Sequence, residues 1–154
     1  MKKVIATALL GLLAAPVYAE GDAANGEKGF KKCKSCHTIV SDSGEVILKG
    51  GKTGPNLYGV AGRAAGSTEG FKYSADMVAA GEGGLVWDEE SFVAFTMSPK
   101  EFLKEVTGND KAKSKMTFKL KKGGEDIYAF LVSVGPAVEE AADEEASEEA
   151  TESN

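Results

Sequence analysis

Five consecutive residues, Cys33 to His37, constrain this chain more than any other feature. They read Cys-Lys-Ser-Cys-His and contain both cysteines and the single histidine of the 154-residue sequence. The spacing C-x-x-C-H is the attachment motif of c-type haem, in which each thiol adds to a vinyl group and forms a thioether. The sequence therefore predicts one covalent haem c, bound through Cys33 and Cys36 with His37 as an iron ligand.

Three other uses of these cysteines agree less well with the rest of the chain. A disulfide across two intervening residues closes a very small loop and contributes little stability. A thioredoxin-like redox pair requires a βαβ setting, which the sequence pattern does not indicate. A structural zinc site needs about four nitrogen or sulfur ligands, whereas Cys33, Cys36 and His37 provide only three.

Residues 1–19 are typical of a secretory signal peptide. Lys2 and Lys3 precede an apolar run over residues 4–15, and small residues stand before a cleavage point after Ala19. The alternative is a membrane anchor, but the run is about twelve residues long and a spanning helix needs roughly 20. We expect a soluble protein, exported to the periplasm, cleaved near Ala19 and without a membrane anchor.

The far end of the chain differs in composition from a folded domain. Residues 139–154 contain eight acidic residues, no basic residue and no aromatic or branched aliphatic side chain. Such a segment buries too little apolar surface to offset the entropy of ordering, which predicts a disordered tail. Two roles stay open for it, a solvated solubility segment or a transient cover for lysines of the domain. Residues 20–138 then form one compact domain.

Within this domain the pattern predicts an all-α fold with long loops around one large cofactor. Five helices are expected, over residues 22–33, 74–81, 88–97, 99–106 and 124–134. Ser74 and Asp88 are suitable N-caps, and Ser98 with Glu101 fits a capping box around Pro99. The last helix carries an apolar stripe at helical spacing. Residues 41–71 hold eight glycines, which indicates irregular chain.

Three methionines are candidates for the second axial position of the iron. Met77 and Met97 fall in predicted helices, where a methionine more often fills the core. Met116 lies in a late loop that follows Ser114 and Lys115. Thioether ligation stabilises ferrous iron and raises the reduction potential. With His37 and Met116 as ligands, the iron has no open position for a substrate.

The ordered set of motifs resembles the class I c-type cytochromes, most closely the bacterial cytochrome c-two group, over about residues 21–134. Gly26 and Phe30 match the residues that cross the C-terminal helix in that family, and the segment 53–57 matches a loop whose proline carbonyl accepts a hydrogen bond from the ligand histidine. The resemblance implies contacts between the haem propionates and an arginine, a tyrosine and a tryptophan. The implied cofactor-binding residues are Cys33, Cys36, His37, Pro55, Arg63, Tyr73, Trp87 and Met116.

Two positions depart from the family pattern. Phe95 stands where the family usually has a tyrosine near the methionine sulfur. Because a phenyl ring cannot donate a hydrogen bond, we expect the environment of the methionine ligand and the reduction potential to differ from those of typical members. Phe130 replaces another tyrosine at the crossing of the terminal helices, where packing dominates and little change is expected.

Lysines cluster around both predicted ligand segments and indicate a docking surface. They are Lys28, Lys31, Lys32, Lys34, Lys111, Lys113, Lys115 and Lys119. Both ligand segments must meet at one iron, so these positive charges are expected to converge and to steer an acidic partner.

The resemblance implies a monomeric electron carrier that is not an enzyme and binds no nucleic acid. Its donor would be a membrane-bound cytochrome bc-type complex, and its acceptor a photosynthetic reaction centre or a terminal oxidase. Two rival classes are an enzyme or gas sensor with an open sixth site, and a fixed subunit of a larger complex.

Overall fold

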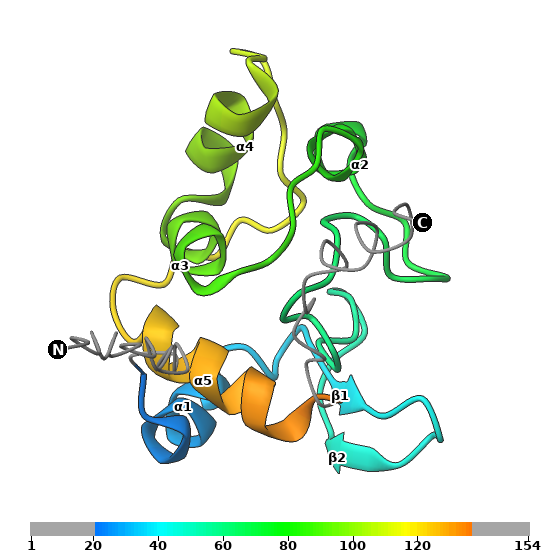
Figure 1. The fold of residues 1–154 in the computed structure, drawn as a ribbon, viewed down its shortest axis with the longest axis vertical. Coiled ribbons are helices and arrows are strands. Elements are labelled where there is room, and N and C mark those ends of the chain that lie inside the picture. Colours follow the sequence, from blue (N-terminus) through cyan, green and yellow to red (C-terminus); the bar gives the residue numbers. More distant parts are fainter. Residues whose placement is uncertain (1–20, 137–154) are drawn as a thin grey trace, which may run out of the picture.

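A computed structural model describes residues 21–136, so the predicted signal peptide and acidic tail lie outside the described residues. The described part contains five α-helices, a short 3-10 helix and one small antiparallel sheet (Figure 1). These elements are α1 (Ala23–Gly29), η1 (Phe30–Lys32), β1 (Ile39–Val40), β2 (Val46–Leu48), α2 (Ala75–Glu82), α3 (Glu89–Met97), α4 (Pro99–Thr107) and α5 (Gly124–Val134). The predicted all-α class with five helices is confirmed. Between residues 21 and 136, none of the helices has the length and apolar character that a membrane span requires.

Helices α1 and α5 cross at a glycine and lie side by side in Figure 1. A Cβ atom on Gly26 would overlap the carbonyl of Asp126 and lie 2.7 Å from the Cβ atom of Phe130. The rings of Phe30 and Phe130 meet edge to face with centroids 5.7 Å apart. The predicted crossing of the terminal helices is therefore confirmed, and it fixes the segment that leads into the cysteine motif.

The first helix is shorter than predicted. Helix α1 ends at Gly29, and a 3-10 turn continues to Lys32 because the backbone N–H of Cys33 bonds to the carbonyl of Phe30 at 2.8 Å. This tighter turn leads directly into the cysteine motif at Cys33.

A small hairpin, which the sequence pattern did not predict, follows the motif. Ile39 in β1 pairs with Leu48 in β2. The outer edge of β1 is satisfied by Asn56, whose side chain accepts from the N–H of Val40 at 3.0 Å and donates to its carbonyl at 2.6 Å. This side chain also ties the hairpin to the loop that contains Pro55.

The caps of the middle helices are mostly as predicted. The Ser74 hydroxyl accepts from the N–H of Met77, and the Asp88 carboxylate accepts from the N–H of Ser91 at 2.8 Å. The capping box expected around Pro99 is wrong, since Ser98 makes no side-chain cap. Its backbone N–H already donates to Ala94 as the last bond of α3.

The buried core combines residues of α5 with residues of α2, α3 and α4 and of the loops between them. The predicted stripe on α5 is confirmed, because Ile127, Phe130 and Leu131 are buried and Val134 is partly buried. The core includes aromatic side chains from α3 and the preceding turn. These side chains form one wall of a cavity.

Candidate functional site

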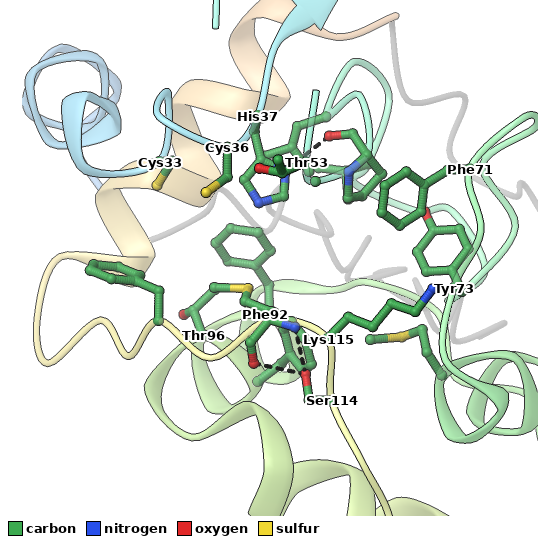
Figure 2. Close-up of a pocket in the computed structure, with 18 of the residues that line it drawn as sticks. Cys33, Cys36, His37, Thr53, Phe71, Tyr73, Phe92, Thr96, Ser114 and Lys115 are labelled. Carbon is green, nitrogen blue, oxygen red and sulfur yellow. Dashed lines mark hydrogen bonds between the residues drawn. The ribbon is translucent and has the colours of Figure 1, made fainter. Parts of the chain in front are cut away.

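A cavity of about 350 Å³ opens between the cysteine motif, α2, α3 and the loop after α4. Its volume lies in the range of roughly 300–1,000 Å³ that is usual for sites of organic ligands. Figure 2 shows Cys33, Cys36 and His37 along one side, with Thr96, Ser114 and Lys115 across from them. All eight cofactor-binding residues predicted from the sequence line this cavity. They are Cys33, Cys36, His37, Pro55, Arg63, Tyr73, Trp87 and Met116.

The cysteine motif forms one turn of chain at the rim. The N–H groups of Cys36 and His37 both bond to the carbonyl of Cys33 at 3.0 Å. No disulfide joins Cys33 to Cys36. In residues 21–136, no group of three or more His, Cys, Asp or Glu side chains is arranged to hold a metal ion.

The two thiols differ in their surroundings. Burial raises the pKa of Cys33 to about 11. Hydrogen bonds from the side chains of Thr53 and Ser35 lower the pKa of the exposed Cys36. Both sulfurs border the cavity and are available for thioether bonds with one ligand.

The ring of His37 is fixed by the loop beneath it. Its Nδ1 atom lies 2.9 Å from the carbonyl oxygen of Pro55. Because a carbonyl can only accept, Nδ1 carries the hydrogen and Nε2 keeps a free lone pair. Burial lowers the pKa of His37, which favours the neutral ring that can act as a ligand. Gly54 permits this contact, since a Cβ atom there would lie 2.6 Å from Nδ1.

The opposite wall contains Met116. The Ser114 hydroxyl accepts from the N–H of Met116 at 3.1 Å and donates to its carbonyl at 2.9 Å. Met77 is buried and also lines the cavity, whereas Met97 is 52% exposed and does not. The interpretation of Met97 as core filler is therefore wrong, and Met77 is a wall residue of the site.

Arg63 and Trp87 are brought together by the backbone. The N–H of Trp87 bonds to the carbonyl of Arg63 at 3.0 Å, next to an isolated bridge between Ala64 and Val86. The guanidinium of Arg63 donates to the carbonyl of Tyr58 at 2.8 Å and to that of Asn56 at 3.2 Å. Burial lowers the pKa of Arg63. These contacts hold a positive charge at the edge of the cavity.

Aromatic residues make up much of the remaining wall. Phe95 packs against Trp87 with ring centroids 5.1 Å apart and lines the cavity at the position where a tyrosine was expected. Tyr73 meets Phe71 edge to face at 4.8 Å. The sequence did not predict several of the lining residues. Only two of them carried a sequence signal: Gly54 stands beside Pro55, and Phe92 is a hydrophobic position in α3. The missed residues include Thr53, Gly54, Phe71, Phe92 and Thr96, and Met77, considered above only as a candidate ligand, is a further wall residue.

The chemistry of these residues fits a covalently attached haem c. The sulfurs of two cysteines stand at one rim, a neutral histidine presents Nε2, and the other walls are mostly apolar and aromatic. Residues 33, 36 and 37 are the positions that would hold the group.

Comparisons with known proteins agree with this fit, although no family model matches the chain. Cytochrome c-551 of Roseobacter denitrificans is 62% identical over 121 residues, covering 79% of this chain and 86% of that protein. The X-ray structure of ferric cytochrome c-550 from Paracoccus versutus has a TM-score of 0.73 and 50% identity, covering 76% of this chain and all of that one.

The structure of cytochrome c2 from Rhodobacter capsulatus gives a similar result. Its TM-score is 0.72 at 54% identity, with 74% of this chain and 98% of that chain covered. The protein therefore belongs to the class I c-type cytochromes of the cytochrome c2 group, electron-transfer proteins, and carries one haem c attached through Cys33 and Cys36.

Proposed function

We propose that this protein is a soluble periplasmic electron carrier whose haem iron is bound by His37 and Met116. It takes one electron from a cytochrome bc-type complex and delivers it to a photosynthetic reaction centre or a terminal oxidase. The observation that supports this most directly is the position of His37 and Met116 in the lining of one cavity, where hydrogen bonds hold the ring of His37 and the backbone of Met116.

The bound haem supplies a one-electron ferric–ferrous couple. His37 binds through Nε2 while Pro55 holds the proton on Nδ1, which orients the ring and increases its basicity. Met116 contributes a neutral sulfur that favours the reduced state.

The side chains around the ligands limit water access and rearrangement. Trp87, Phe92 and Phe95 are buried and form an apolar wall. Such a wall favours the less charged, reduced state. Arg63, Tyr73 and Trp87 are proposed to bind the propionates, and the Arg63 charge offsets part of theirs.

The eight lysines are proposed to form the docking surface. All eight are exposed, and Lys32 and Lys115 border the cavity itself. The one ion pair found within residues 21–136 joins Lys104 to Glu101 and involves none of the eight. None of the eight is paired with a carboxylate in this part of the chain, so their positive charges can attract an acidic surface and release it, as a transient redox contact requires.

The optical spectrum of the oxidised protein tests the ligand assignment. We expect the weak long-wavelength band of methionine sulfur on ferric haem in the wild type and in Met97→Leu, which changes an exposed methionine. Met116→Leu should lose the band and should bind carbon monoxide readily when reduced. Rapid binding of carbon monoxide by the wild type would instead favour an enzyme or gas sensor with an open sixth site.

Export can be tested on the protein from the native host. Cleavage after Ala19 predicts a mature chain that begins at Glu20, and mass spectrometry of the periplasmic fraction measures this directly. Recovery in the membrane fraction with the leader intact would contradict the periplasmic assignment.

A further inference from the structure

We propose that Asp76 is a positioning residue that holds the Met116 loop closed over the cavity. The inference rests on the proposed ligation by Met116 and adds to it the contact that keeps this ligand in place. This loop, residues 108–119, follows α4 and ends before the buried Leu120.

Both carboxylate oxygens of Asp76 are used by this loop. Oδ1 accepts from the side-chain amide of Asn109 at 2.8 Å, and Oδ2 accepts from the backbone N–H of Lys113 at 2.8 Å. The two donors lie on either side of a turn in which Ala112 N–H bonds to the Asn109 carbonyl. One side chain thus clamps both ends of the turn, three residues before Met116.

A second contact ties the same two segments together. The ammonium group of Lys115 donates to the backbone carbonyl of Lys72. In Figure 1 the chain after α4 runs back beside α2, which agrees with these contacts. Since Tyr73 and Met77 on the α2 side also line the cavity, the contacts join two of its walls.

The loop depends on such contacts because it has no helix or strand of its own. Loops of this kind open locally at low free-energy cost unless side chains hold them. Hydrogen bonds to a charged carboxylate are stronger than those to neutral acceptors. They account for the lowered pKa of Asp76, to which the Lys113 N–H makes the largest contribution.

A purely local role for Asp76 would be different. It stands in the first turn of α2, where any acid stabilises the helix by interaction with its N-terminal N–H groups. That role would leave the Met116 loop unaffected, so the test must report on the loop itself.

The test compares haem-loaded wild type with Asp76→Asn and Asp76→Ala. Glu82→Gln is the control, because it removes one exposed negative charge from the other end of the same helix. Two quantities are measured, the amide hydrogen exchange of residues 108–119 and the rate at which imidazole displaces the sixth ligand of the ferric protein. We expect both to rise at least roughly three- to tenfold in the Asp76 variants, the scale that loss of a single hydrogen bond to the loop predicts, and to stay unchanged in Glu82→Gln.

The partner residue provides an independent check. Asn109→Ala should raise exchange in the same residues. Its combination with Asp76→Ala should have less than the sum of the two single effects, because both substitutions remove the same hydrogen bond between Asp76 and Asn109. Wild-type exchange and imidazole rates in Asp76→Ala would overturn the proposal, as would an equal rise in Glu82→Gln.

Failure of the Met116 assignment would have a separate signature. A wild-type spectrum without the methionine band contradicts the proposed ligation, whereas hydrogen exchange of the loop does not involve the iron. Faster exchange confined to 108–119 in Asp76→Asn would then still support the clamp, and unchanged exchange would still overturn it.

Discussion

The Nδ1 atom of His37 lies 2.9 Å from the carbonyl oxygen of Pro55, across 18 positions of sequence. This contact decides which ring nitrogen carries the proton, and so which one can bind iron. It depends on a backbone carbonyl, so its strength is set by the path of the loop. That path passes against the ring at Gly54.

Gly54→Ala is therefore expected to disturb the site. The new methyl group would lie 2.6 Å from Nδ1 of His37, so the ring or the loop must shift. Overpacking of this kind costs about 1–3 kcal/mol, measured as the change in free energy of unfolding of the haem-loaded protein. Gly83→Ala is the control, because its φ of −76° suits alanine and its Cβ atom would lie 3.3 Å from two carbonyl oxygens, a contact that a shift of a few tenths of an ångström relieves. Equal effects of the two substitutions would contradict the argument.

Local sequence rules predicted the parts of the fold that depend on neighbouring residues. Ser74 and Asp88 cap their helices as expected, and the α5 stripe faces the core. The hairpin escaped prediction because strands of two and three residues are too short for a periodic pattern.

In the cavity, too, residues with a local sequence pattern could be predicted and residues placed by tertiary packing could not. Cys33, Cys36 and His37 were identified because their spacing is itself the signal. Met77 was not identified as a wall residue, since its role depends on how α2 packs against distant segments. The clamp by Asp76 has no local sequence pattern, because its partners Asn109 and Lys113 lie 33 and 37 positions further along the chain.

Asp88→Ala is expected to destabilise the start of α3. The side chain accepts from the N–H of Ser91 at 2.8 Å, and loss of such a cap costs about 1 kcal/mol. Glu90→Ala is the control, because Glu90 is an exposed first-turn acid that makes no cap. Chemical denaturation of the two variants measures the difference, and equal losses would show that only helix-dipole charge matters.

The same cap predicts a pH dependence. Hydrogen bonds with the Ser91 side chain and backbone lower the pKa of Asp88 in the folded protein. A lowered folded pKa gives stability that is present above the unfolded value of about 3.9 and is lost as pH falls through the folded pKa. The difference in unfolding free energy between wild type and Asp88→Asn should therefore shrink as pH is lowered below about 4. A constant difference from neutral to acid pH would contradict this linkage.

Phe30→Ala tests the crossing of α1 and α5. Phe30 is fully buried and meets Phe130 edge to face, so truncation should cost about 3–5 kcal/mol. Val106→Ala is a suitable control, because Val106 is 42% exposed on α4. Thermal unfolding of the haem-loaded proteins compares them, and a loss for Phe30→Ala as small as that of the control would mean that the crossing tolerates a cavity.

Substitution of Lys32 tests the proposed docking surface. Lys32 is exposed at the edge of the cavity, so Lys32→Gln removes a charge from the face where an electron must leave. Association with an isolated bc-type complex should slow roughly two- to fivefold at low salt, the scale of one Coulomb contact in water. The difference should disappear at about 0.5 M salt, where screening shortens the reach of the charge. Lys49→Gln removes an exposed lysine that does not border the cavity and should leave the rate near that of the wild type. If both variants slow association equally, net charge rather than a localised surface governs the encounter.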